Sequence, residues 1–93
     1  MNKEDFKKKA KKSIDDIFAK IDELEAKKDK VKEDAKAEYE EKLNNLKTKR
    51  KELQAKYDAL NNASDEKWEE VKSTFSSATD SFKEGFSKIA SLI

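Results

Sequence analysis

Residues 53–75 read LQAKYDALNNASDEKWEEVKSTF. Here a periodic apolar stripe ends at Leu60, and two poor helix formers, Asn61 and Asn62, precede a serine suited to cap a new helix. The acidic residues that follow this serine would lie in the first turn, where the helix dipole favours negative charge. The stretch therefore predicts a helix break at residues 61–64.

An apolar stripe runs outward from this break in both directions. Apolar side chains recur every three or four residues from Phe6 to Ile93, close to the 3.6-residue period of a straight helix. Proline is absent and Gly85 is the single glycine, so the usual signals for strands and turns are missing. Only helix suits this sequence.

We therefore expect one all-α domain over residues 1–93. It should contain a long charged helix over about 3–60, and a Ser/Phe-rich amphipathic segment, 65–93, whose helix covers about 65–92. At 1.5 Å per residue the first helix would be about 85 Å long and the second about 40 Å. The prediction is a helical hairpin or an extended coiled-coil-like oligomer, because a hairpin would leave half of the long helix for another chain. One unbroken helix is the alternative, since the stripe stays in phase across the break.

The composition limits what a single copy could bury. Charged residues make up 46% and hydrophobic residues 34% of 93 residues, so we expect an extended, oligomeric or partner-stabilised chain. Disorder is the alternative, but interleaved charges and periodic apolar residues indicate a helix.

The charges of the 22 basic and 21 acidic residues nearly cancel, which makes nucleic acid an unlikely partner. A lysine cluster at residues 7–12 is better read as a solvated terminus than as a phosphate contact.

The sequence lacks the residues and motifs on which several kinds of catalysis and ligand binding depend. The chain has no His and no Cys, and it has no Gly-rich phosphate loop or calcium-binding loop. We expect no enzyme, no cofactor, no metal site and no small-molecule substrate. Because the longest apolar run is three residues, at 17–19, we also expect no signal peptide and no spanning helix, and a cytoplasmic location is the default.

Two sets of apolar residues are the candidate interaction sites. The first is the predicted oligomer seam of the long helix: Ile14, Ile17, Ile21, Leu24, Leu43, Leu46, Leu53 and Leu60. The second is the predicted partner or lipid face of the C-terminal helix: Trp68, Val71, Phe75, Phe82, Phe86 and Ile89. Much of the remaining C-terminal surface is Ser and Thr, which are mediocre helix formers, so this helix should gain order when its aromatic face is buried. Such a weakly charged amphipathic helix resembles lipid-packing sensors.

Two further stretches carry a family resemblance. Residues 34–40 read DAKAEYE and residues 63–72 read ASDEKWEEVK. Together with the leucines between them, these stretches resemble a family of small bacterial coiled-coil proteins labelled stress-response proteins. The resemblance implies a stress-linked, non-catalytic role and transfers no catalytic residues. This chain departs from the family pattern at Asp65, where the family commonly has Gly, and in its Ser/Phe-rich second helix. A looser likeness to phasins and apolipoproteins rests on the amphipathic pattern alone.

The sequence therefore predicts a non-catalytic helical protein of structural or stress-related function, which associates with further copies of itself. The alternative is a peripheral protein that coats a lipid or granule surface through the C-terminal helix. The number of copies, their orientation and the identity of the partner stay open.

Overall fold

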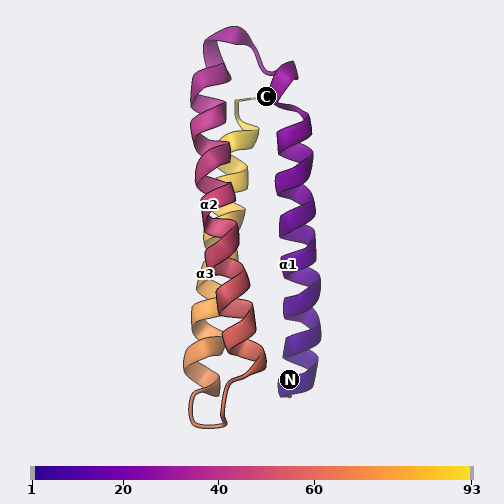
Figure 1. The fold of residues 1–93 in the computed structure, drawn as a ribbon, viewed down its shortest axis with the longest axis vertical. Helices are drawn as coiled ribbons and strands as arrows, with labels where there is room; N and C mark the ends of the chain where they lie inside the picture. Colours follow the sequence, from indigo (N-terminus) through magenta and orange to yellow (C-terminus); the bar gives the residue numbers. More distant parts are fainter. Residues whose placement is uncertain (1, 93) are drawn as a thin grey trace.

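The computed structural model describes residues 2–92, which fold into three α-helices without a strand (Figure 1). The helices are α1 (Lys3–Ala26), α2 (Lys36–Asn61) and α3 (Trp68–Ala90), and two short 3₁₀ turns, η1 (Lys28–Lys30) and η2 (Glu33–Ala35), connect α1 to α2. The predicted all-α class is confirmed. Ile93, the predicted end of the apolar stripe, lies outside the described range.

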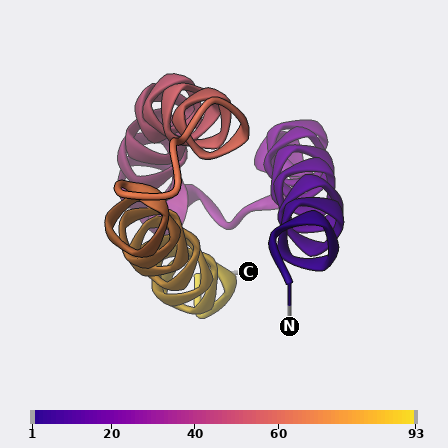
Figure 2. The same ribbon diagram turned by 90° about the horizontal axis from the view of Figure 1, so that it is seen from below.

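The three helices form an up-down-up bundle. They are 24, 26 and 23 residues long, so each can cover the length of its neighbour. The molecule measures 50 × 17 × 17 Å. Seen from one end, α2 lies beside α3 on one side, and α1 stands across from them (Figure 2). Helix α2 packs against both other helices, whereas α1 and α3 contact each other much less.

Local hydrogen bonds set where α1 and α3 begin. Helix α1 begins where the Asn2 side chain accepts a hydrogen bond from the Asp5 N–H at 2.8 Å. The break predicted near Asn61 is present, but Ser64 does not cap a helix. Instead the Lys67 N–H donates to the Ser64 carbonyl at 3.1 Å, and this turn delays the start of α3 from the predicted residue 65 to Trp68.

The helix predicted over residues 3–60 is not continuous, and this is the main correction to the sequence-based picture. The chain bends between Ala26 and Lys36, and two adjacent residues there have extended backbone: Val31 (φ −76°, ψ 141°) and Lys32 (φ −60°, ψ 145°). The bend contains no Gly or Pro, and no described residue has a positive φ. A helix-breaking residue was therefore absent from the sequence at this point.

The free energy gained by burying apolar side chains is larger than the free energy of the helical hydrogen bonds that are lost in the bend. Folding back lets the four aliphatic side chains Ile14, Ile17, Ile21 and Leu24 share a core with those of α2 and α3. Each buried aliphatic side chain contributes about 1.5–3 kcal/mol. The handful of backbone hydrogen bonds lost in the bend are each worth about 1 kcal/mol net, because water replaces the lost partner. The fold-back therefore stabilises a single chain, without the second chain that the long-helix picture required.

Candidate functional site

The predicted oligomer seam lies inside the single chain. All eight of its residues are buried, and Ile17 is the most exposed of them at 7%. The α1 members meet the α2 members across the bundle and share one core with α3. An oligomer built on this seam would therefore require the bundle to open first.

The predicted partner face of α3 points into the same core. Trp68, Phe75, Phe82 and Ile89 are buried, while Val71 and Phe86 are partly buried against the core. Across residues 2–92 no apolar side chain larger than alanine is exposed. The closed molecule thus offers no large apolar patch of the kind that marks a docking surface.

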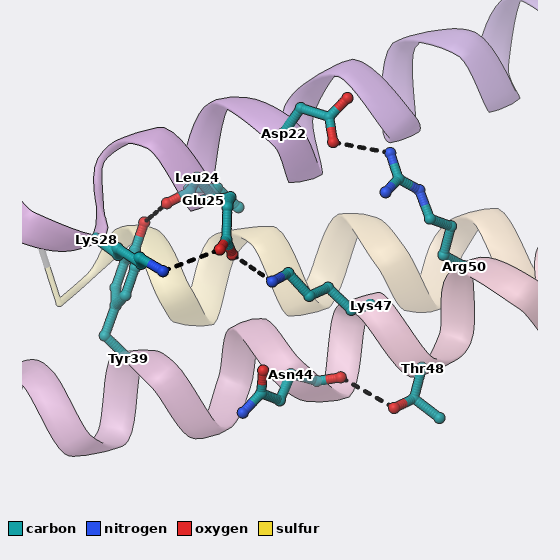
Figure 3. Close-up of polar contacts among 9 residues, drawn as sticks. All are labelled: Asp22, Leu24, Glu25, Lys28, Tyr39, Asn44, Lys47, Thr48 and Arg50. Carbon is teal, nitrogen blue, oxygen red and sulfur yellow. Dashed lines mark hydrogen bonds and ion pairs between the residues drawn. The ribbon is translucent and has the colours of Figure 1, made fainter.

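Helices α1 and α2 are joined by directional polar bonds (Figure 3). The carboxylate of Glu25 on α1 lies between Lys28 Nζ at 3.1 Å and Lys47 Nζ of α2 at 2.5 Å. These ammonium groups hold the pKa of Glu25 below its usual value, and the hydrogen bond from Lys47 is the larger cause. Arg50 of α2 donates to Asp22 at 2.9 Å. These contacts fix the register between the two helices.

Two α2 side chains reach main-chain carbonyls of α1. The hydroxyl of Tyr39 donates to the Leu24 carbonyl at 2.6 Å, and Tyr39 is fully buried. Burial raises the pKa of this hydroxyl. Arg50 donates to the Phe18 carbonyl at 3.3 Å while its guanidinium covers the Phe18 ring, 4.9 Å from the ring centre.

Helix α3 is held differently. Among residues 2–92, no hydrogen bond or ion pair joins an α3 side chain to α1 or α2. Its attachment consists of apolar packing together with aromatic and cation–π contacts, which join Trp68 and Lys72 to Phe6 and Phe75 to Tyr57. Apolar packing has no strong directional requirement, so α3 can leave this core for another apolar environment without abandoning a buried polar bond to α1 or α2.

The start of α1 contacts the first turn of α3 through Phe6 and Lys3, and we call the contacts of these two residues with Trp68 the clasp. The Trp68 ring meets the Phe6 ring edge-on at 5.7 Å, and the ammonium group of Lys3 lies 5.4 Å from the Trp68 ring centre. Lys3 also pairs with Asp65 in the α2–α3 turn, and this hydrogen bond holds the pKa of Asp65 below its usual value. The clasp and the Asp65 pair thus join the start of α1 both to the start of α3 and to the α2–α3 turn.

Three further features of the described part of the chain concern metal sites, membrane-spanning helices and cavities. Within residues 2–92 no cluster of His, Cys, Asp or Glu is arranged to hold a metal ion. No helix in that range is both long enough and apolar enough to cross a bilayer. The hollows of the molecule are shallow grooves between neighbouring helices.

Sequence reasoning missed the residues that tie α1 to α2. Arg50 interrupts the apolar stripe between Leu46 and Leu53, and Lys47 lies beside the stripe. In the sequence each looks like any other cation of a highly charged helix. Their role is visible only in the folded chain, where the bend places Asp22 and Glu25 next to them. A charged residue interrupting an otherwise apolar stripe was the one available signal.

No protein-family model, no curated protein and no solved structure matches this chain. The resemblance to a coiled-coil stress-response family therefore stays a prediction from the quoted residues.

Proposed function

We propose that this protein is a non-catalytic interaction protein whose helix α3 exchanges the core of the bundle for a lipid surface. The closed bundle is the form that does not bind lipid, and α3 is the element that binds the lipid surface after it leaves the bundle. A cytoplasmic location and a stress-linked occasion for the release of α3 belong to the same proposal.

One observation carries the proposal: α3 shares no polar bond with α1 or α2 within the described residues, whereas α1 and α2 share several. Releasing α3 therefore exposes apolar surface without leaving a charged partner buried and unpaired. A bilayer interface returns the apolar contacts that the core supplied. The charges of α3 nearly cancel, with four acidic residues and three lysines, so the attraction depends on apolar insertion and little on anionic headgroups.

A covalent lock on α3 tests this proposal. The chain has no cysteine, so the double variant Leu46→Cys, Gly85→Cys forms a single bridge at a point where α2 and α3 touch. We expect the reduced protein to float with small, loosely packed neutral vesicles, and the oxidised protein to bind at least about tenfold more weakly, because the locked state cannot offer its apolar face. The reduced form of the same variant is the matched control for folding, checked by circular dichroism.

The readout must allow for the burial of Trp68, which is only 9% exposed in the closed bundle. A shift in its emission would be small, so quenching by lipids brominated on their acyl chains is the better signal. In the unlocked protein, Phe86→Ser should weaken binding, whereas Phe18→Ser, a partly buried phenylalanine of α1, should not. Equal binding by the oxidised and reduced forms, or no binding by the wild-type chain, would refute the proposal.

Self-association is a second candidate, and the bend between α1 and α2 favours it. The bend has no Gly or Pro, and its extended residues are Val31 and Lys32. Straightening these two residues would join α1 to α2 as the long helix expected from the sequence. Two such chains would bury the same seam against each other by exchanging α1. Light scattering across a range of concentrations tests this, since only exchange produces an elongated dimer that accumulates with concentration.

A further inference from the structure

The outer groove between α2 and α3 contains a hollow with an unusual set of charges. It has a volume of about 200 Å³ and is lined by Lys42, Asn45, Leu46, Lys49, Gly85 and Lys88. We call it the lysine hollow. Three of its six lining residues are lysines, and none carries a carboxylate.

Four other hollows on the described chain lack this bias. Each is lined by at least one glutamate: Glu52 in the next hollow along the α2–α3 groove, Glu70 in the one beyond it, and Glu4 or Glu25 in the two between α1 and α2. In a chain whose charges nearly cancel, a hollow with cations alone is a local departure from the average. Its field attracts anions.

The lysines are only weakly neutralised by their neighbours. Lys42 lies 3.7 Å from Glu38, and Lys88 lies 3.1 Å from Glu84, each one helical turn away on its own helix. Both glutamates are largely exposed, and surface pairs of this kind contribute little. Lys49 takes part in no ion pair within residues 2–92. A ligand of double negative charge would therefore compete readily with these pairs.

Gly85 shapes the floor of the lysine hollow. A Cβ atom at this position would come 2.9 Å from Leu46 Cδ2, so glycine leaves room for the end of the Leu46 side chain against the α3 backbone. Lysines of both helices line the hollow, and Asn45 adds amide donors to it.

We propose that the lysine hollow binds a phosphate group, either free phosphate or the phosphate ester of a lipid headgroup. Lys42, Lys49 and Lys88 supply the charge, and Asn45 supplies a hydrogen-bond donor. Because α2 and α3 each contribute walls, the site exists only while α3 rests on α2. A bound phosphate therefore stabilises the closed bundle and opposes the release of α3. This last step rests on the proposed function, whereas phosphate binding itself does not.

The single glycine makes the test direct, because Gly85 gives one amide signal in a region of the ¹⁵N–¹H spectrum that few other residues occupy. Inorganic phosphate is titrated into the full chain at constant ionic strength and slightly alkaline pH, where it is a dianion. We expect the Gly85 and Asn45 signals to move and saturate in the millimolar range. The double variant Lys49→Gln, Lys88→Gln should bind about tenfold more weakly, because two of three cations are gone.

The matched control removes the same charge elsewhere: Lys9→Gln, Lys12→Gln on the exposed side of α1 should bind phosphate as the wild type does. Shifts that never saturate, or equal weakening in both double variants, would overturn the site. Glycerol 3-phosphate is titrated in parallel, and tighter binding of this ester than of inorganic phosphate identifies a lipid headgroup as the source.

Vesicle flotation with and without phosphate then tests the coupling. Phosphate should weaken vesicle binding of the wild type and leave the Lys49→Gln, Lys88→Gln variant unaffected. If phosphate saturates the Gly85 signal but leaves flotation unchanged, the site stands and the coupling is refuted. If the wild type never floats, the lipid proposal fails while the phosphate site stands on the titration alone.

Discussion

At the scale of single residues, Tyr39 shows how a polar atom specifies a small core. Its ring is fully buried between α1 and α2, and its hydroxyl reaches a main-chain oxygen that no other side chain contacts among the described residues. The Leu24 carbonyl also accepts the Lys27 N–H at 3.2 Å, near the end of α1. Tyr39 therefore marks the point where α1 stops and the bend begins.

Removing this hydroxyl should weaken the fold measurably. We expect Tyr39→Phe to lower the free energy of unfolding by about 1 kcal/mol, because a buried hydrogen bond is lost while the carbonyl keeps its backbone partner. Tyr57→Phe is the control, since Tyr57 is only partly buried and its hydroxyl makes no hydrogen bond within residues 2–92. Urea denaturation of the two variants makes the comparison. Equal effects would show that the Tyr39 hydroxyl has no special role.

At the scale of elements, the connection between α1 and α2 can adopt two conformations, the observed bend or a continuous helix. Lys32 has φ −60°, the value that proline imposes, and its N–H donates no backbone hydrogen bond within the described residues. Val31 before it is extended, as a residue preceding proline must be. The position therefore accepts proline without strain.

Lys32→Pro should stabilise the closed bundle by about 0.4–1 kcal/mol, because it restricts the unfolded chain and excludes the straight helix. Thermal unfolding followed by circular dichroism measures the gain, and light scattering should find no elongated dimer at any concentration. The converse variant, Val31→Ala with Lys32→Ala, favours the continuous helix and should raise the dimer fraction. An elongated dimer that persists in Lys32→Pro would mean that α1 exchange is not the route to association.

At the scale of the whole molecule, stability should be distributed unevenly. Helices α1 and α2 share polar bonds and a core, whereas α3 depends on apolar packing and the clasp at Trp68. A helix that shares no hydrogen bond or ion pair with its neighbours can open by itself without global unfolding.

Native-state hydrogen exchange can measure this difference. Amides in the middle of α3 should exchange with an opening free energy about 1 kcal/mol or more below that of amides in the middle of α2. Lys3→Gln should lower the α3 value further, because it removes both the Asp65 pair and one of the two cations beside Trp68. Lys9→Gln, an exposed neighbour on α1, serves as the control. Identical exchange in α2 and α3 would indicate one cooperative unit and argue against release of α3.

The sequence by itself determined everything that depends on neighbours along the chain. The apolar period placed the same residues on one face of each helix, and the Asn61-Asn62 pair marked the end of α2. The aromatic face of α3 was recognisable from spacing alone, and its members are the residues now found against the core.

Only the tertiary structure decided which faces meet. Residues 27–35 have the composition of a helix, so local propensity could not separate a continuous helix from a bend at Val31 and Lys32. The choice depends on burial of Ile14 to Leu24 against residues far along the chain, a free energy much larger than the few hydrogen bonds lost. The same fold-back paired Arg50 with Asp22 and Lys47 with Glu25, contacts that no short window of sequence contains. Burial is summed over the whole molecule, and for that reason it settled what periodicity left open.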